Sequence, residues 1–342
     1  MKITFPIYTL CKGGAQRMLA EITNGLVQKG HEVTIIMPKS GVIDYPIIAK
    51  LIQTEKYIIE ETDYPYSDCI VSNFHLTVPS AELASQNGKG KHVRLSMCYE
   101  PMFLAEQHLT FPTYNITQNL FVLSEYQQKI IELSHGVKGT VIPVGVSDTF
   151  NNQGIRNQNS TLTISAIVRM PEGGYAWQRN QDELVDTLLR VHHDFPKIQI
   201  NLICPPDEFK MSRKLRTIAN QGIFNFKLPV DDAELNHLYN QTDIYVTASI
   251  FEAAPLPPLE AMKCGAALAT YYSGGNKDYC INESTALMSY AYEKNLYSHI
   301  VRLIEDDHLR HRISIQGEQE AKKWTWQKST DELEKGVLQL FT

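Results

Sequence analysis

The sequence predicts an α/β fold made of two doubly wound domains. Strand-like runs of β-branched and aromatic residues alternate with amphipathic helical patterns along the chain, and this alternation is typical of βαβ units that build a mainly parallel sheet. The stretch 148–160, rich in Asn, Gln, Gly and Ser, interrupts the alternation and has the composition of a loop. At 342 residues the chain is also long for a single hydrophobic core. We therefore expect domains at 1–150 and 161–320, joined by a linker at 151–160.

The first domain is expected to open with a strand at 2–8, a glycine turn at 12–14 and a helix at 15–29. In that helix Met18 and Ile22 fall on one apolar side, which is the pattern of a helix packed against a sheet. Further strands are expected at 31–37, 68–72, 92–97, 119–123 and 140–144.

The second domain repeats the alternation. Its strands are expected at 161–168, 198–204 and 243–249, with helices at 181–193 and 232–241 and helical patterns from about residue 293 to the end. Two such domains are expected to face a central cleft, because parallel α/β sheets bind ligands at the carboxyl ends of their strands.

The composition excludes several classes of protein. A hydrophobic fraction of 43% and a charged fraction of 20% are those of an ordinary globular protein, and a net charge of -6 gives no reason to expect nucleic-acid binding. The six cysteines are scattered without a C-x-x-C pair, so we expect reduced thiols rather than disulfides or a metal cluster. Neither G-x-G-x-x-G after the first strand nor a Walker A motif is present, which disfavours dinucleotide and P-loop sites.

The N-terminal segment MKITFPIYTL has the pattern of a first strand and lacks the hydrophobic core of a signal peptide. No stretch approaches the ~20 apolar residues that a membrane-spanning helix needs. We therefore expect a cytoplasmic protein.

The stretch Thr247–Tyr279 holds the strongest chemical signal in the sequence. A buried strand is followed by Glu252 in a turn, and a helix is expected to begin near Pro257 or Pro258, with Glu260 in its first turn. Backbone N–H groups at a helix N-terminus attract anions, so a phosphate is expected between the two carboxylates. The alternative is that both acids only complement the helix dipole.

Four segments together carry a family resemblance. The segments are GGAQRMLAEITNGLVQKGHEVTIIMP, FVLSEYQQKIIELSHGVKGTVIPVGVSDTF, IYVTASIFEAAPLPPLEAMKCGAALATYYSGG and WTWQKSTDELEKGVLQLF. In their order and spacing they resemble the retaining GT-B glycosyltransferases of family 4, whose E-x7-E block matches Glu252 and Glu260. The resemblance implies two Rossmann-like domains, the first binding the acceptor and the second the nucleotide sugar. It also implies that residues 321–342 form a helix that crosses back to the first domain.

The resemblance implies a retaining transferase that moves a sugar from a nucleoside-diphosphate sugar to an acceptor hydroxyl, in cell-surface polysaccharide or glycoconjugate synthesis. By matching positions, Glu252 contacts the donor sugar and Glu260 the ribose. The amides of Ala253, Ala254 and Leu256 face the sugar and the diphosphate. A UDP-sugar is the first expectation for the donor, with GDP- and dTDP-sugars as alternatives, and no metal or other cofactor is implied.

The resemblance also implies an arginine and a lysine that hold the diphosphate. Arg169, after the first strand of the second domain, matches the family's arginine. The family's lysine has no counterpart in MPEGGYAWQRNQ, where Arg179 is the nearest cation. Arginine supplies the same charge but prefers planar, bidentate contact over the point charge of an ammonium group. The alternative for Arg169 is an ordinary surface ion pair.

In the first domain, the turn at Gly13 and Gly14 is expected at the carboxyl end of the first strand, where backbone amides can approach phosphates or acceptor closely. A plain strand–helix turn is the alternative. A histidine lines the sugar in the family, and His75 after the SNF strand end is expected in that catalytic role. Its alternative is a polar residue at a strand end. Tyr99 and Glu100 are expected at the edge of the cleft.

Two further hypotheses remain open beside the transferase. One is a GT-B sugar-nucleotide epimerase or phosphorylase, and the other is a non-catalytic partner protein that keeps the fold without turnover, which the missing lysine favours. The partners implied are the donor and a carbohydrate, lipid-linked or protein acceptor, and no nucleic acid. Peripheral contact with the inner face of the membrane stays open, and the oligomeric state is not encoded in any feature found.

Overall fold

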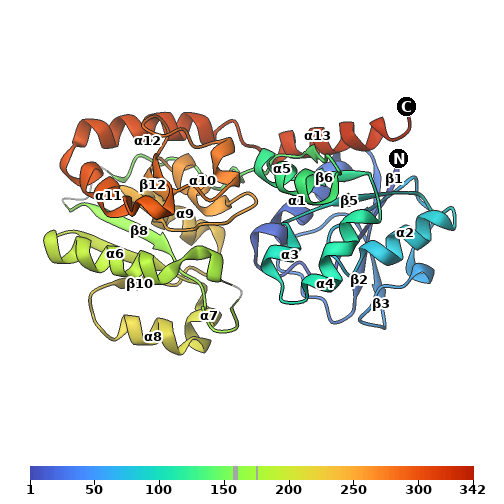
Figure 1. Cartoon of the computed structure of the whole chain (residues 1–342), viewed down its shortest axis with the longest axis horizontal. Helices are drawn as coiled ribbons and strands as arrows, with labels where there is room; N and C mark the ends of the chain where they lie inside the picture. The colour runs from blue at the N-terminus through green and yellow to red at the C-terminus, as the bar shows by residue number, and fades with distance from the viewer. Residues whose placement is uncertain (157–160, 175) are drawn as a thin grey trace. The chain divides into compact units, whose positions relative to one another are not determined.

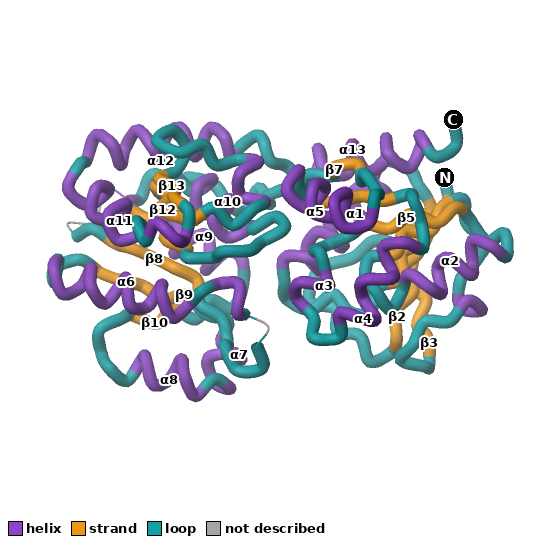
Figure 2. The backbone as a smooth tube through the Cα atoms, in the orientation of Figure 1, coloured by secondary structure: helices purple, strands orange, loops and turns teal. Residues whose placement is uncertain are grey.

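The computed structural model describes residues 1–156, 161–174 and 176–342 (Figure 1). The chain divides into two compact units: unit 1 comprises 1–145 and 325–342, and unit 2 comprises 146–324. Each unit contains one parallel sheet with helices packed on it, as the separate helix and strand colours of Figure 2 show. The predicted fold of two doubly wound, Rossmann-like α/β domains is therefore confirmed.

The sheet of unit 1 has the strand order β3-β2-β1-β4-β5-β6-β7 over its described residues. Its strands are β1 (Lys2–Pro6), β2 (Glu32–Pro38), β3 (Lys50–Thr54), β4 (Cys69–Ser72), β5 (Lys91–Leu95), β6 (Leu120–Val122) and β7 (Thr140–Val141). Its helices are α1 (Gly14–Gln28), α2 (Val78–Gln86), α3 (Glu100–Phe103), α4 (Gln107–Thr110), α5 (Glu125–His135) and α13 (Trp326–Gln339), with 3₁₀ turns η1 (Glu61–Asp63) and η2 (Phe111–Asn115).

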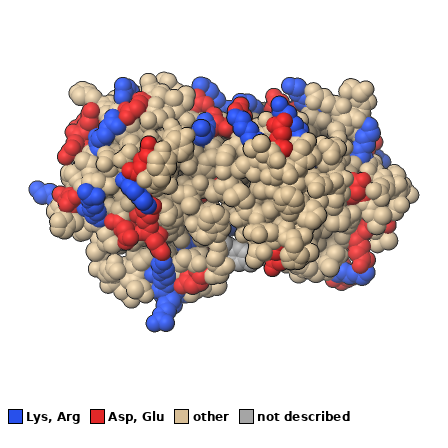
Figure 3. All heavy atoms as spheres, viewed as in Figure 1, with Lys and Arg blue, Asp and Glu red and all other residues tan. Residues whose placement is uncertain are grey.

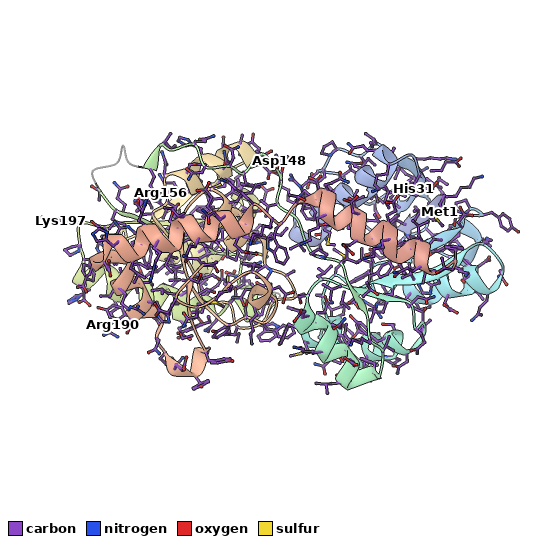
Figure 4. All side chains as sticks on the ribbon, turned by 90° about the horizontal axis from the view of Figure 1, so that it is seen from above. Met1, His31, Asp148, Arg156, Arg190 and Lys197 are labelled. Carbon is purple, nitrogen blue, oxygen red and sulfur yellow. The ribbon has the colours of Figure 1, made fainter. Side chains whose placement is uncertain are left out.

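The C-terminal helix α13 packs on α1 within unit 1. Gly25 of α1 permits the close approach, because a Cβ there would lie 2.4 Å from the Thr330 hydroxyl oxygen. His31 Nε2 lies 2.7 Å from a Glu334 carboxylate oxygen, and His31 Nδ1 lies 3.2 Å from the Met1 amino group. Figure 4 shows Met1 and His31 beside this helix. The last helix thus belongs to the core of unit 1.

The sheet of unit 2 has the order β10-β9-β8-β11-β12-β13 over its described residues. Its strands are β8 (Thr163–Ile167), β9 (Gln199–Ile203), β10 (Asn225–Lys227), β11 (Ile244–Thr247), β12 (Ala267–Tyr271) and β13 (Leu287–Ser289). Its helices are α6 (Gln181–Asp194), α7 (Pro206–Met211), α8 (Arg213–Ala219), α9 (Asp232–Asn240), α10 (Leu256–Lys263), α11 (Leu296–Glu305) and α12 (Asp307–Ala321). Three 3₁₀ turns in the described part of this unit bear on the site: η4 (Trp177–Arg179), η5 (Gly275–Asp278) and η6 (Ala291–Glu293).

Four strands were not predicted from the sequence: β3, β10, β12 and β13. β3 and β10 are short edge strands whose residues are exposed or half-buried except for Thr54, so they lack the apolar run of a central strand. β12 is fully buried and reads ALATY, and alanine favours helix when it is judged by local propensity alone. Pairing with the neighbouring strands β11 and β13 overrides that preference.

The boundaries of the units differ from the expected 150 and 320. Residues 146–156 belong to unit 2, and Thr325 rather than residue 321 begins the return to unit 1. The Asn151 amide donates to Asn236 at 3.2 Å and the Gln153 amide donates to Asn240 at 2.7 Å. The part of the expected linker that is described is therefore attached to α9, while 157–160 lie outside the described residues.

Arg156 attaches this segment to the C-terminal ends of two helices. Its guanidinium donates to the carbonyl oxygens of Thr242 at 2.6 Å, Cys264 at 2.7 Å and Tyr239 at 3.3 Å. These carbonyls lie at the C-termini of α9 and α10, where unpaired acceptors and the negative end of the helix dipole favour a cation. Because α10 carries Glu260, Arg156 supports the predicted site.

Arg156→Ala is expected to destabilise unit 2 by about 2–4 kcal/mol, because it leaves part-buried carbonyls without their charged donor. Urea unfolding followed by circular dichroism measures the change. Arg213→Ala is the matched control, since Arg213 is exposed on α8, and it should shift the midpoint little. Equal midpoints for the two variants would contradict the role of Arg156.

The structure contains no helix, among the residues it describes, with the length and apolar character to cross a bilayer. On the face shown in Figure 3, acidic and basic side chains are interspersed.

Candidate functional site

The loop between β11 and α10 holds Glu252 in a fixed backbone position. The Glu252 amide donates to the Ser273 carbonyl at 2.7 Å, and its own carbonyl accepts from the Gly275 amide at 2.9 Å. Gly274 has φ 98°, a left-handed conformation that favours glycine. The loops that follow β11 and β12 are thus bonded to each other at the carboxyl edge of the sheet.

The Glu252 carboxylate faces a small hollow in unit 2. It accepts from the Ser249 hydroxyl at 3.4 Å and lies 3.9 Å from Arg179 Nη1, with its side chain 15% exposed. The hollow is lined by residues of β8, β11, η4 and α6, by the loop after β11 and by the prolines at the start of α10. These residues are Ile167, Arg179, Leu184, Tyr245, Thr247, Ser249, Glu252, Pro255, Pro257 and Pro258. A carboxylate, a cation and hydroxyl groups therefore meet at one opening.

Glu260 lies further along α10 than the sequence predicted. The helix begins at Leu256, so Glu260 is in the second turn, and the expectation of a first-turn position was wrong. The Tyr239 hydroxyl donates to a Glu260 carboxylate oxygen at 3.3 Å. Burial raises the pKa of Tyr239 well above its ordinary value, so this hydroxyl stays protonated and orients the carboxylate at neutral pH.

The start of α10 offers fewer donors than an ordinary helix N-terminus. Pro257 and Pro258 occupy the second and third helical positions and have no N–H. Leu256 supplies the one amide of the three first positions, and Ala253 and Ala254 precede it in the turn. An anion here would therefore bind to the amides of the turn more than to the first helical turn.

Arg179 reaches the hollow from the loop after β8. It ends the 3₁₀ turn η4, and Asn180 then takes the left-handed conformation, φ 51°, that starts α6. The Trp177 ring is stacked on Phe251 with ring centroids 6.4 Å apart, and the Ile250 amide donates to the Gln178 carbonyl at 2.9 Å. These contacts hold the loop of Arg179 against the loop of Glu252.

Arg169 is paired with an acid that the sequence did not single out. Its Nε donates to Glu208 at 2.7 Å, and its Nη2 donates to the same oxygen. Burial alone would raise the pKa of Glu208, but the hydrogen bonds from Arg169 and the Met170 amide, together with the charges of Arg169 and Arg179, outweigh it and lower the pKa. Glu208 therefore remains charged and neutralises Arg169, as the surface-ion-pair alternative also predicts.

Gly13 and Gly14 lie at the start of α1 in unit 1. The Gly13 amide donates to the Tyr45 hydroxyl oxygen at 3.0 Å, and the Tyr45 hydroxyl is 3.2 Å from the Gly13 carbonyl. Gly13 has φ 174°, an extended conformation that any residue adopts. The structure thus gives this turn an internal partner, and its contact with a ligand stays a prediction.

His75 lies beside a buried ion pair in unit 1. The His75 amide donates to Glu100 at 2.8 Å, and Glu100 pairs with Arg94, which is 1% exposed. His75 Nδ1 is buried and has no hydrogen-bond partner within the described part of the chain. Burial lowers the pKa of His75, so its ring is neutral at pH 7. Its catalytic role stays a prediction.

Glu100 and Tyr99 are buried in unit 1. Tyr99 is 5% exposed, and its hydroxyl lies 3.0 Å from His135 Nε2. Glu100 is 4% exposed and engaged with Arg94. Both residues pack within unit 1, and their expected position at the edge of the cleft stays a prediction.

Of the expected residues of unit 2, Arg179 and Glu252 line the hollow, whereas Arg169 pairs with Glu208 and Glu260 accepts a hydrogen bond from Tyr239. Sequence reasoning missed Tyr245 and Ser249 of the hollow and Glu208, the partner of Arg169. Glu208 follows β9, which pairs directly with β8. The strand order would therefore have predicted that Glu208 lies near Arg169. No group of three or more His, Cys, Asp or Glu side chains is arranged to hold a metal ion in the ranges that the structure describes.

Comparison with known proteins matches residues 173–320 to the sequence model of a family described as "Glycosyl transferases group 1". A curated relative is 25% identical over 248 residues: the UDP-N-acetylglucosamine–peptide N-acetylglucosaminyltransferase GtfA subunit of Streptococcus pneumoniae. The match covers 69% of this chain and 47% of the relative. The aligned region thus spans about half the length of that protein.

Solved structures share the fold over the whole chain. Sucrose-phosphate synthase of Thermosynechococcus elongatus has a TM-score of 0.80 at 15% identity, covering 100% of this chain and 99% of its own. HepE of Anabaena in complex with UDP-glucose has a TM-score of 0.76 at 14% identity, covering 99% of this chain and 100% of its own. The chain therefore has the GT-B fold of these glycosyltransferases.

Proposed function

We propose that this chain, a GT-B protein that carries a group 1 glycosyltransferase domain at residues 173–320, transfers a sugar from a UDP-sugar to an acceptor hydroxyl with retention of configuration. The observation that carries the proposal is the meeting of Glu252, Arg179 and Ser249 at one hollow at the carboxyl ends of β8 and β11. A carboxylate can accept hydrogen bonds from the sugar hydroxyls, and a cation can stabilise the leaving diphosphate.

UDP is proposed as the donor nucleotide because of what similar proteins bind. HepE was solved with UDP and with UDP-glucose, and the name of the curated relative includes UDP-N-acetylglucosamine. We assign the ribose to Glu260, whose carboxylate is oriented by the Tyr239 hydroxyl. The amides of Ala253, Ala254 and Leu256 are assigned to the sugar and the diphosphate.

Arg179 is proposed as the main diphosphate cation. Its separation of 3.9 Å from Glu252 exceeds hydrogen-bond length, so this pair is loose and can open toward a phosphate. Arg169 is bound on two nitrogens by Glu208 and contributes at lower net charge. Two arginines and backbone amides supply the charge stabilisation that a bound metal supplies in other transferases, and we propose that transfer here is metal-independent.

The acceptor is proposed as a carbohydrate, a lipid-linked glycan or a protein, in the synthesis of a cell-surface polysaccharide or glycoconjugate. The name of the curated relative specifies a peptide acceptor and a subunit. A cytoplasmic enzyme is proposed, with contact at the inner face of the membrane as one arrangement that suits a lipid-linked acceptor.

A second candidate is a protein that binds a nucleotide sugar without turning it over. It is favoured by the neutralisation of Arg169 by Glu208 and by the absence of a lysine from the segment 170–181. Slow hydrolysis of UDP-glucose or UDP-N-acetylglucosamine without acceptor would identify the transferase, whereas donor binding without hydrolysis would identify the second candidate.

Glu260→Ala is expected to abolish most of the stabilisation that UDP gives, because the ribose hydroxyls lose their carboxylate partner. A nucleotide at ~100 times its Kd adds roughly 2.7 kcal/mol of stability, which a thermal-shift assay detects. UDP, GDP, dTDP and ADP are compared, each with wild type and variant. Glu305→Ala, at an exposed acid of α11, is the matched control. If no nucleotide stabilises the wild type, the proposed donor site is wrong.

A further inference from the structure

A row of three tyrosines lies on unit 2 outside the hollow of Glu252. The Tyr272 and Tyr290 rings have centroids 4.6 Å apart at 36°, and the Tyr290 and Tyr292 rings have centroids 5.7 Å apart at 16°. Tyr290 is 47% exposed and Tyr292 is 80% exposed. We refer to Tyr272, Tyr290 and Tyr292 as the tyrosine row.

The strands place this row next to the candidate donor site. Tyr272 directly follows β12 and Tyr290 directly follows β13, which pair in parallel and lie side by side in Figure 2. The Tyr272 amide donates to the Ser289 carbonyl at 2.9 Å, so the pairing continues to the tyrosines. Ser273 then accepts from the Glu252 amide. The row is therefore continuous with the loop that positions Glu252.

Several contacts hold the row in place. Lys277 Nζ lies 5.4 Å from the centroid of the Tyr272 ring, a distance at which a cation and an aromatic face attract. The Tyr290 amide donates to Glu293 at 2.8 Å, which closes η6 around Tyr292. Lys294 after η6 donates to Glu183 of α6 at 3.0 Å. The backbone that carries the exposed rings is thus fixed by hydrogen bonds within η6 and to α6.

The geometry leaves aromatic faces open. Parallel rings in direct contact are separated by about 3.5–4 Å, so near-parallel rings with centroids 5.7 Å apart are displaced sideways. Tyr290 and Tyr292 form a stepped surface, and the high exposure of Tyr292 agrees with this. Such a row exposes flat apolar faces, whereas the branched side chains of leucine and isoleucine have no flat face.

We propose that the tyrosine row binds an oligosaccharide chain by stacking against its sugar rings. The C–H faces of sugars are weakly polar and flat enough to lie on aromatic rings, and phenol hydroxyls at the rim can hydrogen-bond to the sugar hydroxyls. The position beside the loop of Glu252 assigns this oligosaccharide as the acceptor or the product of transfer. The inference therefore rests on the proposed function and narrows the acceptor to a glycan chain.

The test is binding to an array of short neutral oligosaccharides built from hexoses and N-acetylhexosamines, with the full-length protein. The wild type is expected to bind at least one of them, and Tyr290→Ala/Tyr292→Ala to bind it about tenfold or more weakly. Tyr292→Phe is expected to keep most of the binding and Tyr292→Leu to lose it, because leucine keeps apolar area without a flat ring. Tyr66→Ala, at a tyrosine of unit 1 that is 75% exposed, is the matched control.

Two readouts separate this inference from the proposed function. UDP thermal shift is measured on the same variants, which lie outside the donor hollow. If UDP stabilises the wild type but no oligosaccharide binds, or binds equally to the double variant, the inference is wrong and the proposed function stands. If an unglycosylated peptide binds through the row in place of any oligosaccharide, the inference is also wrong. If neither UDP nor an oligosaccharide binds, both proposals fail.

Discussion

Glu252→Gln is expected to lower the turnover of the donor by about a hundredfold while UDP still stabilises the protein. Glutamine keeps the shape of the side chain and an oxygen for the Ser249 hydroxyl. It removes the negative charge, which would strengthen the hydrogen bonds to the donor sugar as positive charge develops at the reacting carbon. Loss of one such preorganised group lowers turnover by about a hundredfold. Hydrolysis of UDP-glucose and UDP-N-acetylglucosamine, followed by the release of UDP, measures it.

The distribution of the effect between kcat and KM identifies the role of Glu252. Arg179 lies 3.9 Å from Glu252, so removing the carboxylate makes Arg179 more available to the diphosphate and should leave UDP binding intact or stronger. A fall in kcat with an almost unchanged KM is therefore expected. Glu305→Gln makes the same change at an exposed position of α11 and serves as the control. An unaltered rate in Glu252→Gln would remove Glu252 from the sugar contact.

Gly275→Ala is expected to destabilise unit 2 by roughly 2–4 kcal/mol and to remove the UDP shift. A Cβ at this position would lie 1.8 Å from the Ala253 carbonyl oxygen and 3.0 Å from the Ala254 nitrogen. Both are backbone atoms, which cannot move aside without moving the whole loop. The displacement would also break the bond from the Gly275 amide to the Glu252 carbonyl.

Urea unfolding and the UDP thermal shift measure the two effects separately. Gly317→Ala is the matched control, because a Cβ there would lie 3.1 Å from the Thr285 carbonyl and no nearer than 3.4 Å to the Met262 side chain. In the middle of α12, the gain in helix propensity offsets this contact to within about 1 kcal/mol. A Gly275→Ala protein with wild-type stability and a wild-type UDP shift would show that the two loops do not need their close approach.

The fold could be predicted from the sequence because it depends on patterns that repeat along the chain. The alternation of strands and helices and the apolar side of α1, with Met18 and Ile22 buried, are local features. The edge strands β3 and β10 were missed because pairing with a neighbour, rather than their own residues, makes them strands.

The hydrogen-bond and ion-pair partners of the expected site residues could not be predicted from the sequence. The sequence directed attention to Arg169 as a diphosphate ligand, but the pairing of β8 with β9 brings Glu208 to it. Such a partner lies 39 residues away along the chain, and no spacing rule identifies it. Arg179 was named as the nearest cation, and only the contact of its loop with the loop of Glu252 brings it within 3.9 Å of that acid.

The sequence by itself determined the fold class, the block from Glu252 to Glu260 and the cations available nearby, because these follow from periodicity, spacing and residue type. Only the tertiary structure decided where α10 begins, which carboxylate neutralises Arg169 and which residues attach 146–156 to unit 2. These outcomes depend on strand order and loop packing between residues far apart in the chain. Local conformational preferences do not specify contacts between residues far apart in the chain. Such contacts form only when the strands of the sheet have paired.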